Sequence, residues 1–239
     1  MWDKSVQLLP FFASIHINGK LVNNHQTNND TYRKGTAIVK KQRTDPRVIR
    51  TQRLLRQALI ELMEEREFEQ ITVQEISDRA SIKRVTFYLH YKDKNALLIQ
   101  SIDVVLSELR EQITKYISHT NEFQFRENEP HPSFIELFHQ ISAQFPFYKA
   151  LLVKNRVAYL TNGLLEIIHE FVSEGINQTE PDDNNLTAKR DLIIKYVESA
   201  FLEVIIWWVE NNMHYSEHEM AVQLMTLSIK GPYHRIPSK

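Results

Sequence analysis

The stretch from Ile71 to Lys94, ITVQEISDRASIKRVTFYLHYKDK, constrains the fold of this chain more than any other segment. Thr72 is followed three residues later by Glu75, the pattern of a capping box, in which a hydroxyl and a carboxylate satisfy the free amides at the start of a helix. An apolar stripe then repeats at spacings of three and four, through Val73, Ile76 and Ala80. The sequence therefore predicts a short, half-buried helix that begins at Thr72.

A second short helix is predicted from about Lys83 to Tyr91, after a change of direction around Ser81. Phe87 and Tyr91 are four residues apart and point toward a core. The opposite face carries cations, a hydroxyl, a phenol and an imidazole, on Lys83, Arg84, Thr86, Tyr88 and His90. Two short helices joined by a turn, the second with such a polar face, have the geometry that inserts a helix into the major groove of DNA.

The string from Thr86 to Lys94, TFYLHYKDK, with Thr72 and Ile76 before it, resembles the TetR family of bacterial transcription regulators. The family pattern runs T-hydrophobe-Y-x-H-aromatic-x-x-K. The resemblance implies that DNA phosphates are bound by Thr72, Thr86, Tyr88 and Lys94. It also implies that base edges or the groove wall are faced by Gln74, Lys83, Arg84, Val85, Leu89 and His90. The family's common turn glycine is Ser81 here, a mild departure if this serine avoids positive φ.

Simpler roles exist for single members of this set. Tyr88 alone could be an ordinary half-buried aromatic, and Lys94 a solvated lysine in the first turn of a helix. In combination, Thr86, Tyr88 and Lys94 lie on one side of a short helix and the start of the next, which favours a phosphate clamp. We expect Arg84 to read a base, since its guanidinium matches the O6 and N7 acceptors of guanine, and Lys83 to contact phosphate.

Flanking helices complete a three-helix head. Asp45 and Pro46 supply a cap and a first-position proline, and an apolar period extends that helix to about Glu65. Asp93 then caps a long helix whose period runs through Leu97, Leu98, Ser101, Val105, Leu109 and Ile113. We expect a helix-turn-helix DNA-binding domain over residues 39–94 and a helical effector-binding and dimerisation domain over 95–239. In the family, the long helix joins these two parts.

Charge is divided in the same way. Residues 40–94 hold 13 Lys and Arg against 9 Asp and Glu, whereas residues 95–239 hold 12 against 19, although the whole chain has a formal net charge of −1. A basic end suits a DNA partner. The predicted basic arm consists of Lys40, Lys41, Arg43 and Arg47, and arginines continue at 50, 53 and 56. The alternative is that these cations only solvate the outside of the first helix.

The rest of the chain is helical in pattern, so the predicted fold class is all-α: a three-helix head, a long connecting helix and a helical bundle. Capping boxes are predicted at Ser133 with Glu136 and at Ser216 with Glu219. The predicted body helices span residues 133–144, 147–153, 156–177, 187–212 and 216–230.

The predicted helix 187–212 is apolar over most of its circumference in its second half, so one face needs a partner beyond its own bundle. In the TetR family the last two long helices pair with those of a second subunit, and two heads about 34 to 36 Å apart read a palindromic operator. We therefore expect a homodimer with an interface through Ala200, Val204, Trp207, Trp208 and Leu224.

Many family members hold a small molecule inside the bundle, which moves the long helix and releases DNA. Candidate lining residues here are Phe134, Phe138, His139, Phe145, Tyr148, Tyr159, His169 and Phe201. For the stripe Phe134, Phe138 and Phe145 the hydrophobic core is the simpler explanation. The sequence identifies no effector.

No catalytic, metal or cofactor site is predicted. His214 and His218 are four apart, but the cap at Ser216 lies between them, so they do not share one regular helix. The chain has no cysteine, as suits a reducing cytosol. Phosphate-binding, dinucleotide, nucleophile-elbow and zinc-protease motifs are missing from the sequence. We therefore expect a cytoplasmic protein that is not an enzyme and has no membrane partner.

Residues 1–38 do not follow the family pattern. The apolar run from Leu8 to Ala13 is interrupted by Pro10 and is too short for a membrane span, and the Asn-rich segment 23–30 predicts disorder. Our hypothesis is that this extension is sequence upstream of the gene that has been read as protein. Translation would then begin at a GTG codon at the position of Val39.

The sequence predicts a homodimeric DNA-binding regulator, a repressor of nearby genes released by a small-molecule effector. One alternative is a co-activator or adaptor on the same scaffold that no longer binds an operator. Another is a helical enzyme acting on a small hydrophobic molecule, for which the chain shows no nucleophile and base arrangement.

Overall fold

The structure is a computed structural model that describes residues 45–119, 129–179, 182–184 and 186–230. Its regular elements within those ranges are helices, which confirms the all-α prediction. The α-helices are α1 (Pro46–Glu65), α2 (Val73–Arg79), α3 (Arg84–His90), α4 (Lys94–His119), α5 (Pro132–Ala143), α6 (Phe145–Tyr148), α7 (Ala158–Thr179), α8 (Arg190–Glu210) and α9 (Glu217–Lys230). A 3-10 turn at Phe68–Gln70 and a π-helical stretch at Lys149–Lys154 complete the set.

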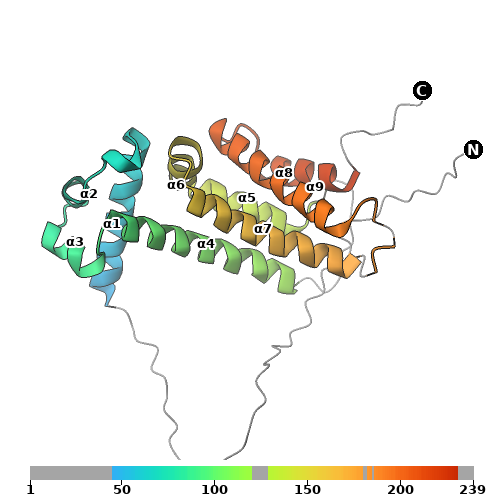
Figure 1. The fold of residues 1–239 in the computed structure, drawn as a ribbon, viewed down its shortest axis with the longest axis horizontal. Coiled ribbons are helices and arrows are strands. Elements are labelled where there is room, and N and C mark those ends of the chain that lie inside the picture. The colour runs from blue at the N-terminus through green and yellow to red at the C-terminus, as the bar shows by residue number, and fades with distance from the viewer. Residues whose placement is uncertain (1–44, 120–128, 180–181, 185, 231–239) are drawn as a thin grey trace, which may run out of the picture.

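The helices form a small head and a larger body (Figure 1). The head consists of α1, α2 and α3 at one end, and α4 leaves it to run along the body. In the body, α7 packs against both α4 and α8, while α5 packs against α4 and α9. A second contact between the two parts joins α1 to α6 and to the π-helical stretch.

The head forms where local capping and apolar spacing agree. Asp45 caps α1, accepting a hydrogen bond from the Arg47 amide at 2.8 Å, and Pro46 takes the first helical position. One face of α1 is buried through Leu55, Ala58, Leu59, Leu62 and Met63. Ile76 of α2 and Phe87 of α3 are fully buried in the same core. Each such large apolar side chain stabilises the head by roughly 1.5 to 3 kcal/mol.

The turn between α2 and α3 differs from the expectation for Ser81. The Ile82 amide donates to the Ser77 carbonyl at 2.8 Å, and the Ser81 amide donates to the Asp78 carbonyl at 3.0 Å. These two bonds make a Schellman motif, which needs a left-handed residue after the helix cap. Ser81 supplies that residue at φ 55°, so it does not avoid positive φ, and a serine occupies a position that favours glycine.

Two predictions for the start of the body were wrong. Helix α5 begins at Pro132, and its cap is His131, whose Nδ1 accepts from the Ser133 amide at 3.3 Å, so Ser133 is inside the helix rather than at a capping box. Burial lowers the pKa of His131 to about 4, so the ring is neutral at pH 7 and able to accept. The predicted helix 147–153 is instead the short α6 followed by the π-helical stretch.

The last two helices follow the prediction with shifted ends. Helix α8 begins at Arg190, three residues later than expected, and ends at Glu210 before Asn212 and Met213, both at φ 54°. The capping box before α9 is confirmed, because the Ser216 hydroxyl accepts from the Glu219 amide and the Glu219 carboxylate accepts from the Ser216 amide.

Two of the predicted dimer residues belong to the core of the single subunit. Trp208 is 1% exposed, packs edge-on against Phe138 at 5.2 Å between ring centroids, and donates its indole N–H to the Tyr215 carbonyl at 2.9 Å. Leu224 is also buried. The prediction that both line a dimer interface is therefore wrong, because the faces of α8 and α9 that carry them pack inward.

Several predictions lie outside the described residues, namely the extension 1–38 and the arm residues Lys40, Lys41 and Arg43. Among the helices that the structure does describe, none combines the length and the apolar character needed to cross a membrane.

We predict that Ser81→Gly raises the free energy of unfolding by about 0.5 to 1 kcal/mol. A left-handed L-residue costs roughly 1 to 2 kcal/mol, and the greater chain entropy of glycine offsets part of that gain. Urea denaturation measures the change. Ser81→Ala is the matched control, since it keeps the Cβ atom and should give no gain. A less stable glycine variant would contradict the strain at this turn.

Candidate DNA-binding interface

Helix α3 has one face fixed in the core and one face free. Phe87 is fully buried, and its ring lies 5.5 Å from Tyr88 and 5.7 Å from Tyr91 between centroids. On the opposite side, Val85 and Leu89 are 75% and 77% exposed. Exposure of that size for two aliphatic side chains, one turn apart on a short rigid helix, marks a contact surface rather than a core position.

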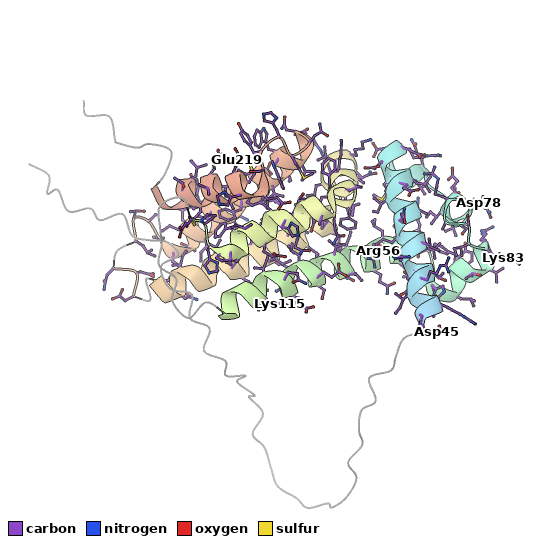
Figure 2. The ribbon with its side chains drawn as sticks, turned by 180° about the vertical axis from the view of Figure 1, so that it is seen from behind. Asp45, Arg56, Asp78, Lys83, Lys115 and Glu219 are labelled. Atoms are coloured by element: carbon purple, nitrogen blue, oxygen red, sulfur yellow. The ribbon has the colours of Figure 1, made fainter. Side chains whose placement is uncertain are left out.

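The start of α3 faces away from the body. Figure 2 shows Lys83 at the outer edge of the head, with its side chain directed into solvent. Lys83 and Arg84 are both exposed. The head therefore presents a cationic helix start beside exposed apolar residues to solvent.

Arg84 and Tyr88 form a pair on the exposed face. The guanidinium Nη2 donates to the Tyr88 hydroxyl at 3.3 Å, and its central carbon lies 5.6 Å from the centre of the Tyr88 ring. Tyr88 is 47% exposed. The ring supports the guanidinium without burying it, so Arg84 has donors left for a partner in the groove.

Thr72 has a structural role in addition to the predicted one. Its hydroxyl accepts from the Glu75 amide at 3.2 Å and donates to a Glu75 carboxylate oxygen at 2.8 Å, so the predicted capping box is confirmed. Hydrogen bonds from Thr72 and the nearby Arg66 guanidinium hold the pKa of Glu75 below its usual range. The phosphate contact of Thr72 stays a prediction, made from a residue whose position the cap fixes.

The remaining predicted residues of α2 and α3 lie on or near the same surface. Gln74 is exposed and donates to the Asp78 carboxylate at 2.8 Å along α2. Thr86 and His90 are half-buried. Their contacts with DNA phosphates and bases stay predictions.

Lys94 does not have the role that the sequence predicted. Its ammonium donates to the backbone carbonyls of Phe68, Glu69 and Ile71 at 2.8, 2.9 and 2.8 Å. An ammonium group has three hydrogens, so none remains for a phosphate while these bonds hold. The structure therefore corrects this prediction and assigns Lys94 to the turn that leads into α2.

The 3-10 turn at Phe68–Gln70 is not predicted by any pattern in the sequence. Phe68 is 8% exposed, and the Lys94 Nζ lies 4.6 Å from the centre of its ring. The bonds of this turn to Lys94 join residues 23 to 26 positions apart in the chain. No local spacing signal marks such a contact.

The exposed side of α1 carries a row of cations. Arg47, Arg50 and Arg53 are exposed and three residues apart. Arg79 is different, because its hydrogen-bonded ion pairs with Glu65 and Glu61 raise its pKa and engage its charge within the head. The predicted role of Arg47 in a basic arm stays open to test, with Arg50 and Arg53 extending its row.

A small apolar cavity of about 20 Å³ lies in the body between α4, α5, α7 and α8. Of the eight candidate effector residues, Phe134 and Phe201 line it, together with Ile113, Ser133, Leu137, Ile167, Ile168 and Phe171. Phe138 and Tyr148 are buried elsewhere in the core, Phe145 is half-buried, and three others are at the surface, namely His139, Tyr159 and His169. Of the stripe for which the core was the simpler explanation, Phe134 and Phe138 are buried, and Phe134 also lines the cavity.

The described residues contain no group of three or more His, Cys, Asp or Glu side chains placed to hold a metal ion. His214 and His218 are both exposed and lie on either side of the start of α9.

Two family models match the chain. The model described as bacterial regulatory proteins, tetR family, matches residues 55–100, and the model described as transcriptional regulator C-terminal region matches residues 128–230. A curated relative, the uncharacterized HTH-type transcriptional regulator YxbF of Bacillus subtilis (strain 168), is 34% identical over 91 residues. That match covers 38% of this chain and 24% of the relative.

Solved structures share the fold. The fatty acid degradation regulator FadR from Bacillus halodurans has a TM-score of 0.58 at 18% identity, over 80% of this chain and 99% of that one. FadR from Bacillus subtilis, solved in complex with stearoyl-CoA, has a TM-score of 0.58 at 17% identity, over 76% and 99%. With the two family models together spanning more than half of the sequence, this chain belongs to the tetR family of bacterial regulatory proteins.

Proposed function

We propose that this protein is a DNA-binding transcription regulator that acts as a homodimeric repressor of nearby genes. The observation that carries the proposal is the outward face of α3, where Arg84, Val85 and Leu89 are exposed while Phe87 anchors the helix in the core. Rigid support beneath an exposed helix is what major-groove reading needs.

The chemistry of that face suits base recognition. A guanidinium pairs with the acceptors of guanine, and aliphatic side chains such as Val85 and Leu89 contact the methyl group of thymine. Lys83 and the α1 arginines supply cations for the phosphate backbone on either side. An adaptor that no longer binds an operator is not favoured, because such a protein would have no use for this exposed set.

Dimerisation is supported by a stripe along α8. Leu192, Tyr196 and Trp207 are 62%, 72% and 45% exposed, and Ala200 and Val204 lie between them at helical spacing. Leu227 adds an exposed aliphatic side chain on α9. An apolar stripe of this length on the surface of a single subunit needs a cover, and a second copy gives the two heads that a palindromic operator requires.

Release by a small apolar effector is the remaining part of the proposal. The cavity between α4, α5, α7 and α8 is lined by aliphatic and aromatic side chains, and Ile113 of α4 forms part of its wall. At about 20 Å³ it has room for little more than one water. A ligand that enters there must therefore displace at least one of the helices that form its walls, and one of these, α4, carries the head. The stearoyl-CoA complex of one structural neighbour is in keeping with an acyl-type effector.

We predict that Arg84→Ala relaxes base preference at one symmetric pair of positions in the operator, at a cost of about 1 to 3 kcal/mol there. The operator is first selected from a pool of random duplexes with the wild-type protein, and affinities are then measured by fluorescence anisotropy on single-base variants. Failure of the wild type to enrich any duplex would contradict the proposed function itself.

Lys83→Ala is the matched control for this experiment. It removes a neighbouring cation, and we expect it to weaken binding to all duplexes alike, with the salt slope lowered by roughly one unit. If Arg84→Ala gives that uniform pattern instead, Arg84 is a phosphate ligand.

We predict that Tyr196→Glu converts the dimer to a monomer in sedimentation experiments. The new carboxylate lies in the middle of the apolar stripe on α8, and dimerisation would bury it without a partner. Operator affinity should fall with it, as each head then binds alone. Ile99→Glu is the control, since Ile99 is an exposed aliphatic residue on α4 outside the stripe. A dimer that survives Tyr196→Glu would place the interface elsewhere.

A further inference from the structure

We propose that Asn155 is a positioning residue for the DNA-binding head, and that it latches the Phe68 turn to the body so that α2 and α3 keep one orientation. The inference rests on the proposed function, since the orientation of α3 matters only if α3 binds DNA. It adds a second route between body and head, separate from the covalent link through α4.

Asn155 uses both ends of its side-chain amide. Its Oδ1 accepts from the Phe68 amide at 2.8 Å, and its Nδ2 donates to the carbonyls of Met63 at 3.0 Å and Ala150 at 2.9 Å. An amide side chain has two N–H donors, so both are used. One side chain thereby joins Asn155 to Phe68, 87 positions away in the chain, and to Met63, 92 positions away.

The latch also completes the end of α1. The last four carbonyls of a helix have no partner inside the helix. At the end of α1, Asn155 satisfies the Met63 carbonyl, and the Lys154 ammonium satisfies the Glu64 carbonyl. A helix of the head is therefore capped by two adjacent side chains of the body.

The π-helical stretch explains why Asn155 points at the head. The Asn155 amide donates to the Ala150 carbonyl at 3.0 Å, five residues back, and the Val157 amide donates to the Leu151 carbonyl at 2.7 Å. Arg156 closes the stretch at φ 46°. A π-helical turn adds a residue relative to an α-helix and is commonly found at functional positions. Here it fixes the backbone that carries Asn155.

The amide and the carbonyl group of Phe68 are bound by different parts of the molecule. The Phe68 amide bonds to Asn155 of the body, whereas the Phe68 carbonyl bonds to Lys94 at the start of α4. Ile71, the last residue that Lys94 holds, precedes Thr72, the cap of α2. A shift of either holder therefore moves the residues that position the helix-turn-helix.

The same stretch is connected to the apolar cavity. Helix α7 begins three residues after Asn155 and supplies Ile167, Ile168 and Phe171 to the cavity wall. The π-helical stretch also packs against α8. A change in the cavity can thus reach Phe68 through α7 and Asn155, as well as through α4.

The test uses the full-length dimer and a duplex selected by the wild type from a random pool. We expect Asn155→Ala to weaken operator binding about tenfold, the size of one or two lost net hydrogen bonds, without loss of the dimer. Asn162→Ala is the matched control, since Asn162 is exposed on α7, and it should bind as the wild type does. Equal affinity of the Asn155 variant and the wild type would overturn the proposal.

Amide hydrogen exchange gives a readout that does not depend on DNA, and its measurement on the wild type does not depend on a variant that folds. In the wild-type protein the Phe68 amide should be protected to the level of Leu164 in the core of α7, and in Asn155→Ala this protection should fall while that of Leu164 is kept. Free exchange of Phe68 in the wild type would overturn the latch on its own. If the wild type enriches no duplex, the proposed function fails, and exchange still shows whether the latch exists.

Discussion

Three backbone carbonyls that meet at one ammonium group hold the head together. Lys94 binds the carbonyls of Phe68, Glu69 and Ile71, and so fixes the path of the chain from α1 into α2 at the point where α4 begins. Charge-assisted hydrogen bonds of this kind are stronger than neutral ones. Because Thr72 follows Ile71 directly, this turn sets the position of the capping box of α2 and so of α2 and α3.

The surface of α3 follows from that fixed position. Phe87 is fully buried in the core of the head, and a seven-residue helix that turns one residue inward must turn its other face outward. Arg84, Val85, Tyr88 and Leu89 are therefore presented together. These side chains do not stabilise the head, because none of them adds buried apolar area to its core. Their exposure is explained by a DNA partner that contacts this face.

Helix α8 carries apolar side chains both toward the core of the subunit and toward solvent. It is apolar over most of its circumference in its second half, so its core-facing side leaves a second apolar face outside the subunit core. Phe201, Ile205 and Trp208 fill the core of the subunit, whereas Leu192, Tyr196 and Trp207 face solvent in the single chain. The sequence shows the excess of apolar residues but not which tryptophan faces which way. Trp207 and Trp208 are adjacent and point about 100° apart on the helix, so the position of one residue along the chain decides which of them is buried.

Local chemistry in the sequence determined the head: caps at Asp45, Thr72 and Asp93, apolar spacing, and the motif from Thr86 to Lys94 are each complete within a few residues. Tertiary structure decided the role of Lys94, the inward turn of Trp208 and Leu224, and the contacts of Asn155. These depend on carbonyls and side chains that are distant in the chain, or on which side of a uniformly apolar helix meets the core. Periodicity identifies an apolar face, but only packing determines what covers it.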